Sequence, residues 1–164
     1  MKNYFEFYNI SEQFHLDQKN LKSLYLDMSR KNHPDFFIND EENYEEALAV
    51  TALNNEAYKT LNNYGSRIKY ILELNGVLQE SGNKLAAHFL MEMMDVNEAI
   101  MDLKMEPNPL KTKELVIEIA AMEDELQTSM KELTQEYDEA KEKTGSFQDL
   151  EELKEIYLKM KYVL

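Results

Sequence analysis

Apolar side chains recur at intervals of three and four along most of this chain, a spacing that places them on one face of an α-helix. The pattern runs from Leu21 to Met28 and returns over a longer stretch from Leu115 to Ala140. Gly and Pro number only 4 and 3 among 164 residues, so few positions can interrupt helices. The sequence therefore predicts an all-α protein.

Breaks between the helices are expected where a residue disfavours helical backbone. Asp17 can cap a first long helix, and Pro34 pushes His33 towards extended backbone, so this helix ends at about Asn32. The later helices are predicted over residues 42–62, 66–75, 84–105, 110–143 and 147–164, with breaks at Gly65, Gly76, Pro107, Pro109 and Gly145.

Composition excludes several classes of function. The chain has no cysteine, which rules out disulfides, thiolate catalysis and cysteine-ligated metal centres. Its three histidines are far apart in sequence, so no histidine-ligated metal site is expected, while a site made of carboxylates alone remains open. No cofactor is expected. A net charge of −14 argues against nucleic acid as the main ligand. With no apolar run of about 20 residues and no signal peptide, the chain is expected to be soluble and intracellular, without membrane attachment.

The stretch GVLQESGNK, residues 76–84, reads as a hinge between two domains because it has two glycines and no apolar periodicity. Formal charge differs across it, being −4 over residues 1–84 and −10 over residues 85–164. The two halves are therefore expected to meet different partners. The three helices predicted after the hinge, joined by short turns, are expected to form an antiparallel bundle.

The tripeptide His33-Pro34-Asp35 joins the first two long helices. By itself it predicts only a turn, with Pro34 as a helix breaker. Its surroundings add Tyr25 eight residues before the histidine, the segment LNNEAYKTL at residues 53–61, and NYFEFYNIS near the start. Together these segments resemble the J domain, in which a helical hairpin carries His-Pro-Asp in its loop.

The rest of the chain resembles the HscB family of J-type co-chaperones. The segments that carry this likeness are SRIKYILELNG, residues 66–76, and AAHFLMEMMDVNEAI, residues 86–100. The resemblance implies a J domain over residues 1–75, the hinge, and a three-helix bundle over residues 85–164. It also implies a cytoplasmic protein of bacterial type that is not an enzyme. Its expected partners are an HscA/DnaK-class ATPase chaperone, whose hydrolysis it stimulates, and the IscU-type iron–sulfur scaffold protein.

In J proteins the His-Pro-Asp loop and the outer face of the second helix contact the chaperone. The resemblance therefore assigns chaperone binding to the loop, and the helical wheel adds a cationic face beside it. The assigned residues are His33, Pro34, Asp35, Lys19, Lys22, Arg30 and Lys31. The sequence departs from the common pattern at Phe36, where many J domains have lysine, and at Leu26, a position that is often basic.

The helix predicted from Lys84 has two apolar faces, although a helix in a three-helix bundle needs only one. The predicted core face contains Leu85, Phe89, Met93, Val96, Ile100 and Leu103. The second face contains Leu90, Met94, Met101 and Met105, flanked by Met91 and Glu98. We expect this second face to be exposed and to bind a partner, because methionine adapts to varied surfaces. The alternative is that the J domain packs over it near its start.

By resemblance to the family, scaffold binding falls on this second face, with an acidic border. The assigned residues are Leu90, Met91, Met94, Asp95, Glu98 and, from the last helix, Tyr157. Asn97 stands where many members have a basic residue. Other classes of function remain open: a J protein with a different client, an oligomerisation module with a vestigial His-Pro-Asp, and, most remotely, a carboxylate-metal hydrolase.

Overall fold

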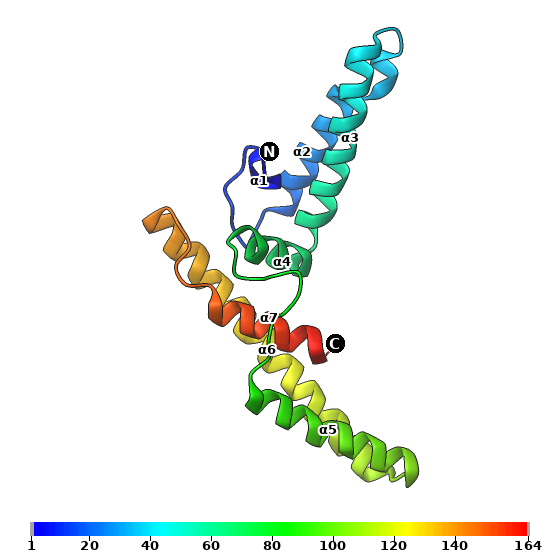
Figure 1. The fold of residues 1–164 in the computed structure, drawn as a ribbon, viewed down its shortest axis with the longest axis vertical. Coiled ribbons are helices and arrows are strands. Elements are labelled where there is room, and N and C mark those ends of the chain that lie inside the picture. The colour runs from blue at the N-terminus through cyan, green and yellow to red at the C-terminus, as the bar shows by residue number, and fades with distance from the viewer. Residues whose placement is uncertain (1, 164) are drawn as a thin grey trace. The chain divides into compact units, whose positions relative to one another are not determined.

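The computed structural model describes residues 2–163, and every regular element in that range is helical (Figure 1), which confirms the all-α prediction. The elements are α1 (Tyr4–Phe7), α2 (Gln18–Lys31), the 3-10 helix η1 (Pro34–Phe37), α3 (Glu41–Asn62), α4 (Tyr64–Leu74), α5 (Ala87–Met105), α6 (Pro109–Thr144) and α7 (Glu151–Val163). The chain divides into two compact units, the first ending at Leu74 and the second beginning at Asn75.

An antiparallel hairpin of α2 and α3 is the main feature of the first unit, and Figure 1 shows the two helices side by side with their connecting loop at one end. The rings of Tyr25 and Tyr58 stack across it with centroids 4.3 Å apart. Ala57 and Leu61 are fully buried. Apolar burial of this kind supplies most of the stability of a small helical unit.

A buried polar network fastens α1 to this hairpin. The Tyr8 hydroxyl lies 2.6 Å from the side-chain oxygen of Asn54, to which it donates. The Asn54 amide nitrogen donates in turn to the Tyr25 carbonyl and the Ser29 hydroxyl, both at 3.1 Å. Because each buried polar atom finds a partner, the network holds three segments in one register.

The ends of α2 follow the sequence prediction. The Asp17 side chain accepts hydrogen bonds from the backbone N–H groups of Lys19 and Asn20, which otherwise lack partners in the first turn. His33 has extended backbone, with φ −65° and ψ 125°, as expected before proline. The loop predicted after it contains a short 3-10 helix, η1, beginning at Pro34.

The predicted break at Gly65 is wrong, because Gly65 lies inside the first turn of α4. The chain breaks instead at Asn63, whose backbone is extended with φ −98° and ψ 126°. The Asn63 side chain accepts a hydrogen bond from the N–H of Ser66 at 2.9 Å. Asparagine favours this position because its side chain satisfies a helix-terminal donor.

Two helices of the second unit begin later than predicted. The first, α5, starts at Ala87 rather than Lys84, and no side chain caps it. The last, α7, starts at Glu151 rather than Phe147, after Asp149 accepts the Glu151 N–H at 2.9 Å. The long helix α6 follows the prediction and ends at Gly145, whose φ of +83° suits glycine.

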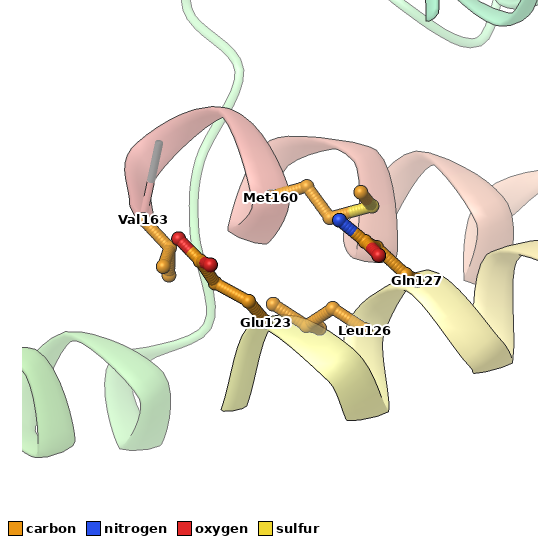
Figure 2. Close-up of a pocket in the computed structure, with 5 residues that line it drawn as sticks. All are labelled: Glu123, Leu126, Gln127, Met160 and Val163. Carbon is orange, nitrogen blue, oxygen red and sulfur yellow. The ribbon is translucent and has the colours of Figure 1, made fainter. Parts of the chain in front are cut away.

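The long helix α6 is shared by two antiparallel pairings, with α5 along its first part and α7 along its second (Figure 1). The α5 core of Phe89, Met93 and Val96 packs on residues from α6 and on Val163. Figure 2 shows where α7 crosses α6, with Met160 and Val163 facing Leu126, and the space between them is too small for a ligand. This packing leaves part of α5 without a helical neighbour from its own unit.

The Tyr8 network predicts a loss of stability in alkaline solution. Burial raises the pKa of the Tyr8 hydroxyl well above its ordinary value of 10.0, and the nearby Tyr25 and Tyr58 raise it further. The unfolded chain therefore releases this proton first, so the stabilisation is complete below pH 10 and is lost as pH rises further. In urea denaturation from pH 7 to 11, Tyr8→Phe should make the alkaline decline shallower and cost about 1 kcal/mol at pH 7. An unchanged alkaline decline would contradict this assignment.

Candidate functional site

The His33-Pro34-Asp35 sequence forms an ordered turn at the tip of the α2–α3 hairpin. The Nδ1 atom of His33 accepts a hydrogen bond from the Asp35 backbone N–H at 3.2 Å. The N–H of Phe36 donates to the His33 carbonyl at 3.0 Å, which closes the turn. Pro34 occupies the first position of η1, where its missing N–H costs no hydrogen bond. The tripeptide is thus held by its own local contacts.

Both polar side chains of the turn, His33 and Asp35, face solvent. A carboxylate oxygen of Asp35 lies 3.6 Å from His33 Nδ1. Because Nδ1 accepts the backbone N–H, a neutral imidazole carries its proton on Nε2. The turn offers a partner one imidazole donor and one carboxylate acceptor in a fixed arrangement.

The predicted cationic face of α2 is solvent-exposed and leads towards this turn. Its four members, Lys19, Lys22, Arg30 and Lys31, are all exposed. The face also contains Asp27, whose carboxylate is 4.0 Å from the Arg30 guanidinium, so part of the positive charge is balanced locally. A pair this exposed contributes little to stability and is free to exchange partners.

Exposed apolar side chains lie beside the turn, and periodicity alone did not indicate them. Phe36 is 72% exposed, and Ile38 is also exposed. The Phe36 ring meets the His33 ring edge-on, with centroids 6.0 Å apart. On α2, Leu26 is exposed four residues before Arg30, within the cationic face. The only sequence signal was the departure of Phe36 and Leu26 from basic residues common in J domains.

In the second unit, α5 has the two apolar faces that the sequence predicted. Phe89, Met93 and Val96 are buried against α6 and Val163. The opposite face is exposed: Leu90 is 38% exposed, and the methionines lie between 64% and 82%. We name this surface the α5 stripe; its members are Leu90, Met91, Met94, Met101 and Met105. Within the second unit the stripe is exposed, as the sequence predicted.

Acidic side chains border the α5 stripe. Asp95, Glu98 and Asp102 are all exposed, so their charges face solvent beside the methionines. A negative rim around an apolar patch favours encounter with a basic partner surface. Tyr157 is half-buried on α7. The ring of Tyr162 on α7 lies 5.9 Å from the ring of Phe89 on α5, measured between ring centres. The helix that contains Tyr157 therefore packs beside the start of α5.

Two groups of exposed apolar residues on α6 were missed by the sequence analysis. Leu110 lies in its first turn, and Val116 with Ile117 one to two turns later. Their neighbours Leu115 and Ile119 pack on the α5 core, which turns Ile117 to the outside. Neighbouring residues of a helix point in different directions. Which of these apolar residues are exposed therefore depends on which face of α6 packs against α5.

Residues 2–163 contain neither a metal-binding cluster nor a membrane-spanning helix. No group of three or more His, Asp or Glu side chains lies close enough there to hold a metal ion. None of the helices in that range is both long enough and apolar enough to span a bilayer.

Comparison with known sequences identifies relatives of this chain. Residues 85–164 match the family model of the HSCB C-terminal oligomerisation domain. A co-chaperone protein HscB homolog of Shewanella denitrificans is 34% identical over 84% of this chain and 81% of its own length. The iron–sulfur cluster co-chaperone protein HscB of Mus musculus is 30% identical over 98% of this chain, which spans 64% of the mouse protein.

Comparison with solved structures gives the same answer for the fold. The crystal structure of human co-chaperone protein HscB matches 99% of this chain and 77% of its own, at 28% identity and a TM-score of 0.69. It combines a J domain with a C-terminal helical domain, as the helix order here does. Since the bacterial relative also aligns over most of both sequences, the chain belongs to the HscB family of co-chaperones.

Proposed function

We propose that this protein is a co-chaperone that binds an IscU-type iron–sulfur scaffold protein and stimulates ATP hydrolysis by an HscA/DnaK-class chaperone. The observation that carries the proposal is the exposed His33-Pro34-Asp35 turn at the tip of a helical hairpin, in a chain of the HscB family. The exposed α5 stripe on the second unit supports the client-binding half. The protein itself performs no covalent chemistry in this scheme.

Chaperone binding falls on the first unit. The His33 imidazole and the Asp35 carboxylate point outwards and are preorganised by the turn, so little conformational entropy is lost when a partner binds them. Lys19, Lys22 and Arg30 attract an acidic surface of the chaperone. Stimulation follows if this contact is stronger in the hydrolysing state of the chaperone than in its resting state.

Phe36 and Leu26 give this contact an apolar component. Both are exposed, and Phe36 adjoins His33, so a partner that covers the turn also covers the Phe36 ring. Apolar burial does not depend on ionic strength as charge pairing does. We therefore assign the chaperone contact to His33, Pro34 and Asp35 with apolar support from Phe36, and to the cationic face of α2.

Scaffold binding falls on the second unit, at the start of the α5 stripe. Leu90, Met91 and Met94 form the apolar centre, while Asp95 and Glu98 form its acidic border. A buried apolar centre with a charged rim is the usual arrangement of a protein–protein contact. We assign Tyr157 to the edge of this surface. Holding client and chaperone on one chain raises the concentration of client at the chaperone.

The test is single-turnover ATP hydrolysis by the cognate chaperone, measured with this protein in the presence and absence of scaffold protein. We expect the protein to accelerate hydrolysis and the scaffold to increase that acceleration. Acceleration that is indifferent to scaffold would keep the chaperone contact and favour a different client. No acceleration under either condition would refute the proposal.

Removal of the apolar centre should weaken scaffold binding strongly without unfolding the protein. In Leu90→Ala with Met94→Ala, two exposed side chains are truncated while Phe89, Met93 and Val96 keep the core packed. We expect scaffold affinity to fall about thirtyfold or more, since a few central residues dominate such contacts. Isothermal titration calorimetry measures the affinity, and circular dichroism the melting temperature.

The matched control is Val116→Ala with Ile117→Ala, which also truncates two exposed apolar residues but on α6. We expect its scaffold affinity to stay within about twofold of the unmodified protein. Normal scaffold binding by the α5 variant, or equal losses in both variants, would contradict the assignment of the stripe.

A further inference from the structure

The exposed methionines of the described residues lie together on one face of α5. Of those within residues 2–163, the exposed ones are Met91, Met94, Met101 and Met105. The others in that range, which are buried or half-buried, are Met28, Met93, Met122, Met130 and Met160. Every exposed methionine of the described residues therefore belongs to the α5 stripe, the surface assigned to scaffold binding.

The sulfur chemistry of the chain is confined to methionine, because it has no cysteine. It also lacks tryptophan, another side chain that oxidants attack. A peroxide that meets this protein thus finds its most accessible reactive atoms in the thioethers of the α5 stripe. Met93 and Met130 are buried, and oxidation follows exposure, so peroxide reacts more slowly with their sulfurs in the folded state.

We propose that the α5 stripe is a reversible oxidation site, at which peroxide converts exposed methionines to methionine sulfoxide and so releases the scaffold protein. The thioether sulfur attacks one peroxide oxygen, so an S–O bond forms and the O–O bond breaks. The proton on the attacked oxygen passes to the departing hydroxide, which leaves as water. Sulfur loses two electrons and hydrogen peroxide gains them. This inference rests on the proposed scaffold-binding function of the same surface.

The consequence for binding follows from the change in polarity. A sulfoxide oxygen is a strong hydrogen-bond acceptor, so burying it against an apolar partner surface without a donor is unfavourable. Met91 and Met94 lie among the residues assigned to the centre of the contact, where this desolvation cost is largest. The acidic border at Asp95 and Glu98 adds acceptors rather than donors, so it offers the new oxygen no compensating hydrogen bond.

The fold itself is spared by this oxidation. The core face of α5, with Phe89, Met93 and Val96, points away from the stripe and packs against α6. A change confined to exposed side chains of one helix face alters binding while leaving packing unaffected. Because methionine sulfoxide reductases restore the thioether, the change is reversible.

The experiment treats the full-length protein with hydrogen peroxide and follows it in two ways. Peptide mass spectrometry is expected to find sulfoxide first at Met91, Met94, Met101 and Met105, with Met93 and Met130 unmodified while circular dichroism is unchanged. Calorimetry against an IscU-type scaffold is expected to show a loss of affinity of about tenfold or more. Treatment with both methionine sulfoxide reductases should restore the original affinity.

The location of the effect is tested by replacing pairs of methionines with leucine, which peroxide does not oxidise. For Met91→Leu with Met94→Leu, the ratio of affinities before and after peroxide should approach one, whatever the starting affinity. For Met28→Leu with Met160→Leu, the ratio should equal that of the unmodified protein. Equal affinity of oxidised and reduced protein for the scaffold, or oxidation of buried methionines first, would overturn the inference. Absence of scaffold binding before oxidation would instead refute the proposed function.

Discussion

His33→Gln is expected to abolish stimulation of the chaperone ATPase and to leave both the fold and scaffold binding unchanged. The substitution removes the imidazole whose Nδ1 accepts the Asp35 N–H and whose ring meets Phe36. An exposed residue at a loop tip contributes little to packing, so the melting temperature should change by less than about 2 °C. Single-turnover hydrolysis without scaffold should return to the rate of the chaperone alone.

The size of this effect follows from how stimulation works. Acceleration requires an interaction that favours the hydrolysing state, and the turn presents only two polar side chains for it, His33 and Asp35. Losing one of two preorganised groups in a small contact costs about 2–4 kcal/mol, which is at least thirtyfold in binding of the active state.

A matched control makes the same chemical change elsewhere. His88→Gln alters an exposed histidine in the first turn of α5, within the other unit. It should leave scaffold-free stimulation at the level of the unmodified protein. Full stimulation by His33→Gln, or equal losses in both variants, would remove His33 from the chaperone contact.

Arg67→Ala should destabilise the first unit more than any surface change. Arg67 is 4% exposed, and its Nε donates to the Phe14 carbonyl at 2.7 Å while Nη1 donates to the Leu61 carbonyl. The guanidinium also lies 5.5 Å from the centre of the Tyr64 ring. One side chain thus joins the loop before α2, the end of α3 and the start of α4.

Truncation of Arg67 leaves two buried carbonyl groups without these donors and opens a cavity. Charge-assisted hydrogen bonds contribute about 1.5–3 kcal/mol each, and the cavity adds to the loss, so we expect destabilisation of at least about 3 kcal/mol. Arg67→Lys should recover only part of it, because a single ammonium lacks the planar fork of a guanidinium. The measurement is hydrogen exchange at increasing urea concentration, read out on peptides. It gives the stability of residues 2–74 and of residues 87–163 separately.

Arg30→Ala serves as the comparison for this loss, since Arg30 is exposed and paired only with Asp27 among the ion pairs of the described residues. Its effect on the free energy of unfolding should stay within about 0.5 kcal/mol. If the Arg67→Ala variant keeps the exchange protection of α4 within about 1 kcal/mol of the unmodified protein, Arg67 does not hold these three segments together.

The sequence alone determined those helix ends that are set by a single capping or breaking residue. Asp17 caps α2, Pro34 forces extended backbone at His33, and Gly145 ends α6 with a positive φ. These are local effects of single residues on neighbouring backbone, so they need no knowledge of distant contacts. The exposed face of α5 was equally predictable, because one helix showed two apolar faces and a bundle can cover only one.

Tertiary structure decided what depends on partners distant in sequence. The helix α3 ends at Asn63 and not at Gly65. Arg67 is a residue type that is usually exposed, yet it is buried here and donates hydrogen bonds to carbonyl groups of two other segments. Phe36 is exposed beside His33 because the closed turn directs its ring outwards, which a nonperiodic loop does not indicate. Local conformational preference sets the helix ends. The burial of a side chain depends on which surfaces pack together, and this follows from contacts between residues far apart in the sequence.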